Sequence, residues 1–233
     1  STAPSGPNTL ITSIPEQGSA GGSLVQASAG LQPFLRDAVG VGGATEGQYA
    51  DYTGSRRLSH TAPATTFNYG GPNDDDFTVV CAFLTDGTAG NLQLYSTMAA
   101  VTASQAGFFA RTQGGNSVLP GLSPNGVANW VGLVASPTLN NGWHFLACRY
   151  GSASYALNCD DMQTPYSSGG YPFSHPENGS PNSATMGHGT PSAGAPGGVA
   201  FGIWPRKLSV PELETTMSIF MGKVGLTAPA GVA

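Results

Sequence analysis

The side chains that most often carry acid–base catalysis are sparse in this chain of 233 residues. Four histidines are present, His60, His144, His175 and His188, and none stands in a His-Glu-x-x-His metal motif. The sequence has no Gly-x-Ser-x-Gly nucleophile turn and no phosphate-binding loop. It therefore predicts a protein that is not an enzyme.

One dense acidic cluster, Asn73-Asp74-Asp75-Asp76, precedes an apolar run. Calcium is bound by several carboxylate and carbonyl oxygens, so Asp74, Asp75 and Asp76 are a candidate calcium site. Nothing in the chain matches the twelve-residue EF-hand calcium loop. The alternative is a solvated turn that leads into a strand at Phe77. No other cofactor is expected.

Aromatic and amide side chains gather in residues 163–182, a stretch rich in Gly, Pro and Ser. Sugar rings stack on aromatic faces, planar amides bond to their hydroxyls, and loops on a rigid β scaffold often carry binding. The glycan-binding candidates are Tyr166, Tyr171, Phe173, His175, Asn178 and Asn182. The alternative is that the aromatic side chains only anchor the loop or fill the core.

Charged residues make up only 9% of the chain, against about 25% in typical domains. The net charge of −5 argues against nucleic-acid binding, which depends on Lys and Arg contacts with phosphate. No apolar run approaches eighteen residues, so no membrane-spanning helix is expected. The N-terminal segment shows no signal-peptide pattern, so a leader either was removed or was never used. A neutral polar surface suits packing into a larger assembly or contact with neutral glycans.

Short apolar runs alternate with Gly, Pro and Asn from Gln48 onward, which is typical of antiparallel sandwiches and jelly rolls. The expected strands are 48–52, 77–83, 92–96, 107–111, 130–134, 143–150, 154–158, 184–187 and 199–204. Leucines and a phenylalanine in 31–38 indicate a short turn of helix.

One helix is expected at Val210 to Met221. Ser209 and Glu212 have the spacing of a capping box, and Pro211 suits the first helical turn. Gly222 is the expected C-terminal stop. The apolar residues of the segment recur at helical spacing and predict one buried face.

Three segments are expected: an extended N-terminal arm at 1–30, one sandwich at 31–225 and a tail at 226–233. Termini rich in Gly and Pro are ordered only when they are tied down. The arm is therefore expected to contact other protein subunits of an assembly. The alternative is that it adds an edge strand to its own sandwich.

The cysteines, Cys81, Cys148 and Cys159, are odd in number and do not have metal-binding spacing. Cys81 and Cys148 lie in expected strands, where a free cysteine behaves as a small buried apolar residue. A Cys148–Cys159 disulfide is the alternative if those two strands pair.

Three segments resemble laminin-G-like, concanavalin A-like lectin domains. The first is the strand at 198–204, which runs through Pro205-Arg206-Lys207-Leu208 into the capped helix; this resembles the closing segment of that family. The run Phe77-Thr78-Val79-Val80-Cys81-Ala82-Phe83 resembles its "F-T-[IV]-x-x-W" strand, with Ala82 at the Trp position. The run 142–150 resembles its "G-x-W-H-H-[VL]-A-x-x-Y" strand, and 157–161 occupies the place of its following hairpin.

The resemblance implies an all-β fold, a concanavalin A-like antiparallel β-sandwich (jelly roll) with one short C-terminal helix. Glycosidases of this fold carry a Glu-x-Asp-x-x-Glu strand; the nearest match, Glu212-Leu213-Glu214, lacks the third acid and falls on the expected helix. A polysaccharide hydrolase or lyase is therefore the least favoured hypothesis.

Two functional hypotheses remain. One is a structural or attachment protein of a large particle, such as a capsid decoration or tail component of a phage virion, in contact with host-surface glycans. The other is a secreted or cell-surface carbohydrate-binding module. The expected location is accordingly the virion, or the extracellular space and cell surface.

Overall fold

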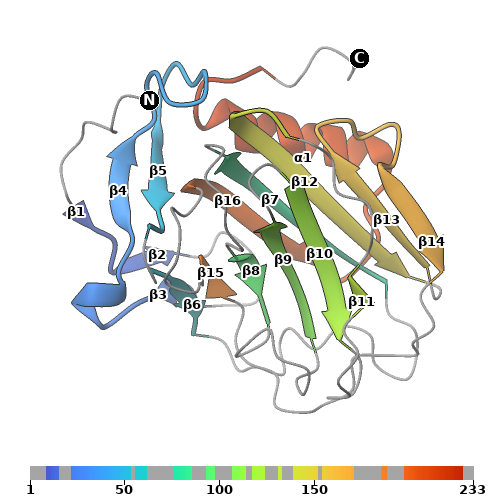
Figure 1. Cartoon of the computed structure of the whole chain (residues 1–233), viewed down its shortest axis with the longest axis horizontal. Coiled ribbons are helices and arrows are strands. Elements are labelled where there is room, and N and C mark those ends of the chain that lie inside the picture. The colour runs from blue at the N-terminus through green and yellow to red at the C-terminus, as the bar shows by residue number, and fades with distance from the viewer. Residues whose placement is uncertain are drawn as a thin grey trace.

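The computed structural model describes residues 9–15, 22–53, 56–61, 76–85, 93–97, 107–113, 117–123, 131–132, 139–151, 154–170, 185–187 and 197–227. These residues form two eight-stranded antiparallel sheets and one α-helix, as the sequence predicts (Figure 1). Sheet A has the order β1 (Thr9–Leu10), β4 (Phe34–Asp37), β5 (Gln48–Asp51), β16 (Gly197–Trp204), β7 (Phe77–Thr85), β12 (Gly142–Gly151), β13 (Ser154–Cys159) and β14 (Ser167–Gly170). Sheet B has the order β11 (Val131–Gly132), β10 (Ser117–Ser123), β9 (Gly107–Gln113), β8 (Gln93–Ser96), β15 (Thr185–Met186), β6 (Leu58–His60), β3 (Ser23–Val25) and β2 (Ser13–Pro15).

Two neighbouring inner strands of sheet A, β7 and β12, are buried on both faces. β7 pairs with β12 over nine residues, from Phe77 opposite Tyr150 to Thr85 opposite Gly142. Successive side chains of a strand point to opposite faces, and on β12 the even-numbered Leu146 and Cys148 join the core between the sheets. Burial on both faces explains why both strands are almost continuously apolar in sequence.

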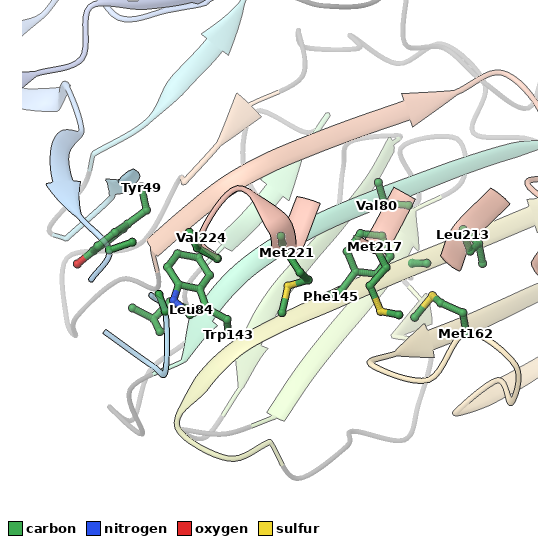
Figure 2. Packing of buried hydrophobic residues seen from close by; sticks show 14 of the residues in the cluster. Tyr49, Val80, Leu84, Trp143, Phe145, Met162, Leu213, Met217, Met221 and Val224 are labelled. Atoms are coloured by element: carbon green, nitrogen blue, oxygen red, sulfur yellow. The ribbon is translucent and has the colours of Figure 1, made fainter. Parts of the chain in front are cut away.

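The helix α1 (Val210–Gly222) forms a third layer on the outer face of sheet A (Figure 2). Its buried side chains, Leu213, Met217 and Met221, pack over β7 and β12. The strand residues beneath them include Ala82, where the resembled family carries Trp, and Ala147. Small side chains at these positions allow the helix to approach the sheet closely.

The ends of α1 follow from local sequence. Ser209 and Glu212 form the expected capping box, in which the backbone N–H of Ser209 donates to the Glu212 carboxylate over 2.8 Å. The expected stop at Gly222 is wrong, because Gly222 is still helical. The chain leaves the helix at Gly225, which has a φ of +67° that glycine adopts without strain, and Leu226 N–H then donates to the Met221 carbonyl.

Each strand expected from the sequence has a counterpart in the structure, with ends that differ by at most two residues. The short helix expected at 31–38 is wrong. The structure has a 3-10 turn, η1 (Ala29–Leu31), and then strand β4, which pairs with β5 with Phe34 opposite Asp51. Strand pairing therefore overrides the helical spacing of Leu31, Phe34 and Leu35.

Residues 9–15 and 22–30 of the expected arm lie against this same chain. β1 pairs with β4 at the edge of sheet A, while β2 and β3 extend sheet B beyond β6. In the described part of the chain, the N-terminal segment thus adds edge strands to its own sandwich. The boundaries at 30 and 225 stay predictions.

Among the described residues, no helix is long and apolar enough to cross a bilayer.

Candidate functional site

Of the six predicted glycan-binding residues, only Tyr166 belongs to the described residues. Its side chain is 44% exposed, and its backbone N–H donates to the Leu157 carbonyl just before the edge strand β14. The others, Tyr171, Phe173, His175, Asn178 and Asn182, lie outside the described residues. Their grouping stays a prediction.

The predicted calcium site is described only in part. Asp76 is half-buried, and its carboxylate lies directly against Gly151 at the end of β12. Asp74 and Asp75 lie outside the described residues. Within the described ranges, no group of three His, Cys, Asp or Glu side chains is placed to hold a metal ion.

His144 is a buried strand residue whose two ring nitrogens both meet acceptors. Nδ1 lies 2.6 Å from the Asp160 carboxylate, and Nε2 lies 2.8 Å from the Asn140 carbonyl. Burial lowers the pKa of His144, but Asp160 and the Asn140 carbonyl outweigh it, so the net pKa is raised above 6.5. Asp160 also accepts from the backbone N–H of Phe145, which gives the pair a structural role at the junction of β12 and β13.

The two acids of the helix do not face each other across a site. Glu212 accepts from Arg206 at 2.7 and 3.0 Å and caps the helix at Ser209. Glu214 instead accepts from the side-chain amide of Gln163. The rejection of a glycosidase acid pair at these residues agrees with this geometry.

All three cysteines are free, as the sequence favoured. The register places Cys159 opposite Leu146, so Cys148 is its diagonal neighbour across the β12–β13 pair. Diagonal neighbours stand about 7–8 Å apart, beyond the usual Cα separation of a disulfide. Burial raises the pKa of all three thiols, that of Cys148 to about 12.

The outer face of sheet B differs from that of sheet A. On β9, Phe108 and Ala110 point into the core between the sheets, so Phe109 and Arg111 point outward. Antiparallel partners share a face, which adds Gln93 and Ser96 of β8 and Leu119 and Gly121 of β10. We call these six residues the outer-face cluster. Because α1 packs on sheet A, no described helix covers this cluster.

Gln93 is the most informative member of the outer-face cluster. Its side chain is 7% exposed, and its Nε2 group has no hydrogen-bond partner among the described residues. An unpaired buried amide costs about 1–3 kcal/mol, so a native protein that retains one usually provides a partner from outside its own chain. The amide therefore has a donor available for a water, an ion or a ligand.

Phe109 lies opposite Ser96 of β8 and packs closely over a glycine of β10. A Cβ added at Gly121 would come within 2.5 Å of the Phe109 ring, so only glycine allows the ring to lie across β10. The Arg111 guanidinium carbon lies 5.8 Å from the ring centroid, and Gln93 is the cross-strand partner of Arg111. The amide of β8 and the guanidinium of β9 are thus cross-strand partners, and the Phe109 ring of β9 lies near the guanidinium.

Arg149 carries another buried donor without a hydrogen-bond partner among the described residues, but its surroundings indicate a structural role. This donor, Nε, lies under α1 on the opposite sheet. Its Nη2 donates to Asn158 over 3.0 Å and its Nη1 faces the Leu208 carbonyl at 3.5 Å, which ties the helix entry to β13. These contacts give Arg149 a structural role.

The outer-face cluster can bind hydroxyl-bearing molecules. Amide and guanidinium N–H groups donate to sugar hydroxyls, whereas the Phe109 ring is fully buried and packs within the protein. These residues were not predicted from the sequence, because Gln93 and Arg111 fall within or at the edge of expected strands and carry no motif. The polar side chains alternating with core residues were the available signal.

No family model matches the chain, and no curated protein matches it. Solved structures share its fold. A GH54 α-L-arabinofuranosidase, soaked with 4-nitrophenyl α-L-arabinofuranoside, has a TM-score of 0.65 at 14% identity over 96% of this chain and 53% of that one. Botulinum neurotoxin type C, from a study of cell entry through two ganglioside molecules, has a TM-score of 0.56 at 9% identity over 93% and 51%.

A leech intramolecular trans-sialidase has a TM-score of 0.52 at 11% identity, covering 77% of this chain and 27% of that chain. The chain thus spans about half the length of the arabinofuranosidase and the neurotoxin chain, and about a quarter of the trans-sialidase. At these identities the likeness concerns the fold alone. Together with the two sheets, it shows that the chain is an all-β antiparallel sandwich.

Proposed function

We propose that this chain is a carbohydrate-binding module, found outside the cell or at its surface, whose outer-face cluster holds a glycan. The observation that carries the proposal is the buried Gln93 amide with an unpartnered Nε2 donor. Its position opposite Arg111, whose guanidinium carbon lies 5.8 Å from the Phe109 ring centroid, supports it. The similar structures named for an arabinofuranoside, gangliosides and sialyl transfer add support at the level of fold.

The same fold carries both binding domains and glycosidases, and fold alone does not choose between them. A glycosidase usually needs two carboxylates across the scissile bond. The register of the described strands puts no Asp or Glu on the outer face of sheet B. This composition favours binding over hydrolysis at that face.

The laminin-G-like identity and the role in a phage virion are finer hypotheses. The similar structures named above are toxin and glycosidase domains, and none supports a virion role. The β1 and β2–β3 pairings give the described part of the N-terminal segment a place within its own sandwich. We therefore place the carbohydrate-binding module ahead of the virion subunit.

The test is a glycan array on the purified chain, followed by calorimetry with the best ligand. Gln93→Met removes the amide and keeps the length and volume of the side chain, so we expect affinity to fall by tenfold or more. The folded protein should be as stable as the parent or about 1 kcal/mol more stable, because an unpaired buried donor has gone.

Gln163→Met is the matched control. Gln163 is exposed, and its side-chain amide contacts Glu214 of α1, on the side of sheet A. It should bind as the parent does. The proposal fails if no glycan binds, or if Gln93→Met binds unchanged. A Gln93→Met variant that is strongly destabilised would show that the amide has a partner within the chain.

A further inference from the structure

Cationic side chains are concentrated at one edge of sheet A. The chain has eight Lys and Arg residues and a net charge of −5, yet Arg36, Arg56 and Arg57 fall within one short stretch. Arg36 lies on β4, and the other two follow β5. In Figure 1, β4 lies at the far side of the sandwich from β13 and β14, close to the sheet edge formed by β1.

Two of these guanidinium groups stack on the same aromatic ring. The Arg56 Cζ atom lies 3.8 Å from the Phe34 ring centroid, and the Arg36 Cζ atom lies 4.6 Å from it. Phe34 and Arg36 pair with Asp51 and Tyr49, so both point to the outer face of sheet A. Each stack contributes about 0.5–1 kcal/mol at such a partly exposed site, while the two cations repel each other.

One carboxylate offsets part of this charge. Asp51 Oδ2 accepts from Arg36 Nε over 3.0 Å, and the Asp51 side chain is only 8% exposed. The nearby acid Asp37 follows Arg36 on β4 and therefore points to the opposite face of the strand. Its carboxylate accepts from the Val39 N–H. Asp51 thus neutralises Arg36, and Arg56 is the second cation at the Phe34 ring.

Arg56 has the donors that an incoming anion needs. A guanidinium has five N–H donors, and the described structure engages Arg56 through Nη1, which donates to the Gln32 carbonyl. Within the described ranges no carboxylate pairs with Arg56. The Phe34 ring fixes the plane of the guanidinium, and a preoriented guanidinium recognises planar anions in bidentate fashion.

We propose that Phe34, Arg36 and Arg56 form a second binding site, for the carboxylate or sulfate group of an acidic sugar. The overall negative charge disfavours long polyanions such as nucleic acids, which need many phosphate contacts. A single cationic site on a neutral polar surface suits isolated anionic groups spaced along an otherwise neutral chain, as in acidic polysaccharides. This site is on the opposite sheet from the outer-face cluster and does not depend on the function proposed for that cluster.

Affinity electrophoresis or calorimetry with four polymers tests the site: hyaluronan for carboxylates, dextran sulfate for sulfates, dextran as the neutral control and polyglutamate as an acidic peptide. The parent should bind hyaluronan, dextran sulfate or both at least tenfold more tightly than dextran, and more weakly as salt rises. A preference between the two anionic polymers identifies the anion.

Arg56→Gln keeps a donor for the Gln32 carbonyl and removes the charge, so binding to the anionic polymer should fall about tenfold or more. Arg56→Lys keeps the charge and should retain part of the affinity. This variant tests whether the loss in Arg56→Gln comes from the missing charge and not from misfolding. Lys207→Gln removes an exposed cation elsewhere and should bind as the parent does. Gln93→Met should also leave this binding unchanged, so that the two sites are tested separately.

Equal binding of dextran and the anionic polymers would overturn the proposal, as would unchanged binding by Arg56→Gln. Polyglutamate that binds as tightly as hyaluronan would overturn the assignment to a sugar.

Discussion

The Nδ1 atom of His144 lies 2.6 Å from the Oδ2 atom of Asp160, and this contact joins the start of β12 to the end of β13. His144 Nε2 faces the Asn140 carbonyl at 2.8 Å. Since both partners are acceptors, both ring nitrogens must donate, which only the imidazolium form allows. Asp160 has a φ of +60°, so its backbone turns sharply to bring the carboxylate under the histidine.

This pair predicts a pH dependence of stability. Folding raises the pKa of His144 above 6.5, so its contribution is fully present below pH 6.5 and is lost as pH rises through the folded-state value. The free energy of unfolding, measured by denaturant titration, should therefore decrease over that range. The C–H resonances of His144 in an NMR titration should have a midpoint above 6.5.

Asp160→Asn is the control for this pair, because asparagine tolerates a positive φ and keeps an acceptor for the Phe145 N–H. The His144 midpoint should fall in this variant, and the slope of stability with pH should flatten. A parent midpoint at or below 6.5 would contradict the charged pair.

Glu212 predicts a dependence at acid pH. Hydrogen bonds from Arg206 and Ser209 lower the pKa of Glu212 from 4.5 to about 2. Its contribution is present above pH 4.5 and is lost as pH falls toward 2. Glu212→Gln keeps the capping geometry, since glutamine also serves at this position. The free energy of unfolding should decrease less between these pH values in the variant than in the parent. An equal decrease in both proteins would contradict the lowered pKa of Glu212.

Gly121→Ala should destabilise the protein by about 1–3 kcal/mol, because the new Cβ would come within 2.5 Å of the fully buried Phe109 ring. It should also weaken glycan binding at the outer-face cluster. Gly30→Ala is the matched control: nothing lies within 4 Å of its added Cβ, and its stability should stay within about 0.5 kcal/mol of the parent. Thermal unfolding of both variants measures the difference.

The three thiols should be unreactive in the folded protein. Burial raises the pKa of Cys81, Cys148 and Cys159, so little thiolate forms near neutral pH. A chromogenic disulfide reagent should react slowly with the native chain and should titrate three thiols after unfolding in urea. A count of one thiol after unfolding would reveal a disulfide.

Much of the fold could be predicted because its signals are local. The capping box at Ser209 and the helical spacing of Leu213 and Met217 act within a few residues, so α1 was expected at nearly its observed bounds. β7 and β12 were expected because both are long apolar runs. β10 was missed because Pro120 and Gly121 indicate a turn, although they lie inside a strand that pairs with β9.

The tertiary structure alone decided the outer-face cluster. Gln93, Phe109 and Gly121 carry no mutual signal in sequence, and they meet because β8, β9 and β10 pair in one register. A shift by one residue would turn each of these side chains to the other face. The alternation of side chains within a strand can be predicted from its sequence. The register between strands is set by the packing of two whole sheets, and the Gln93 amide is buried only in that register.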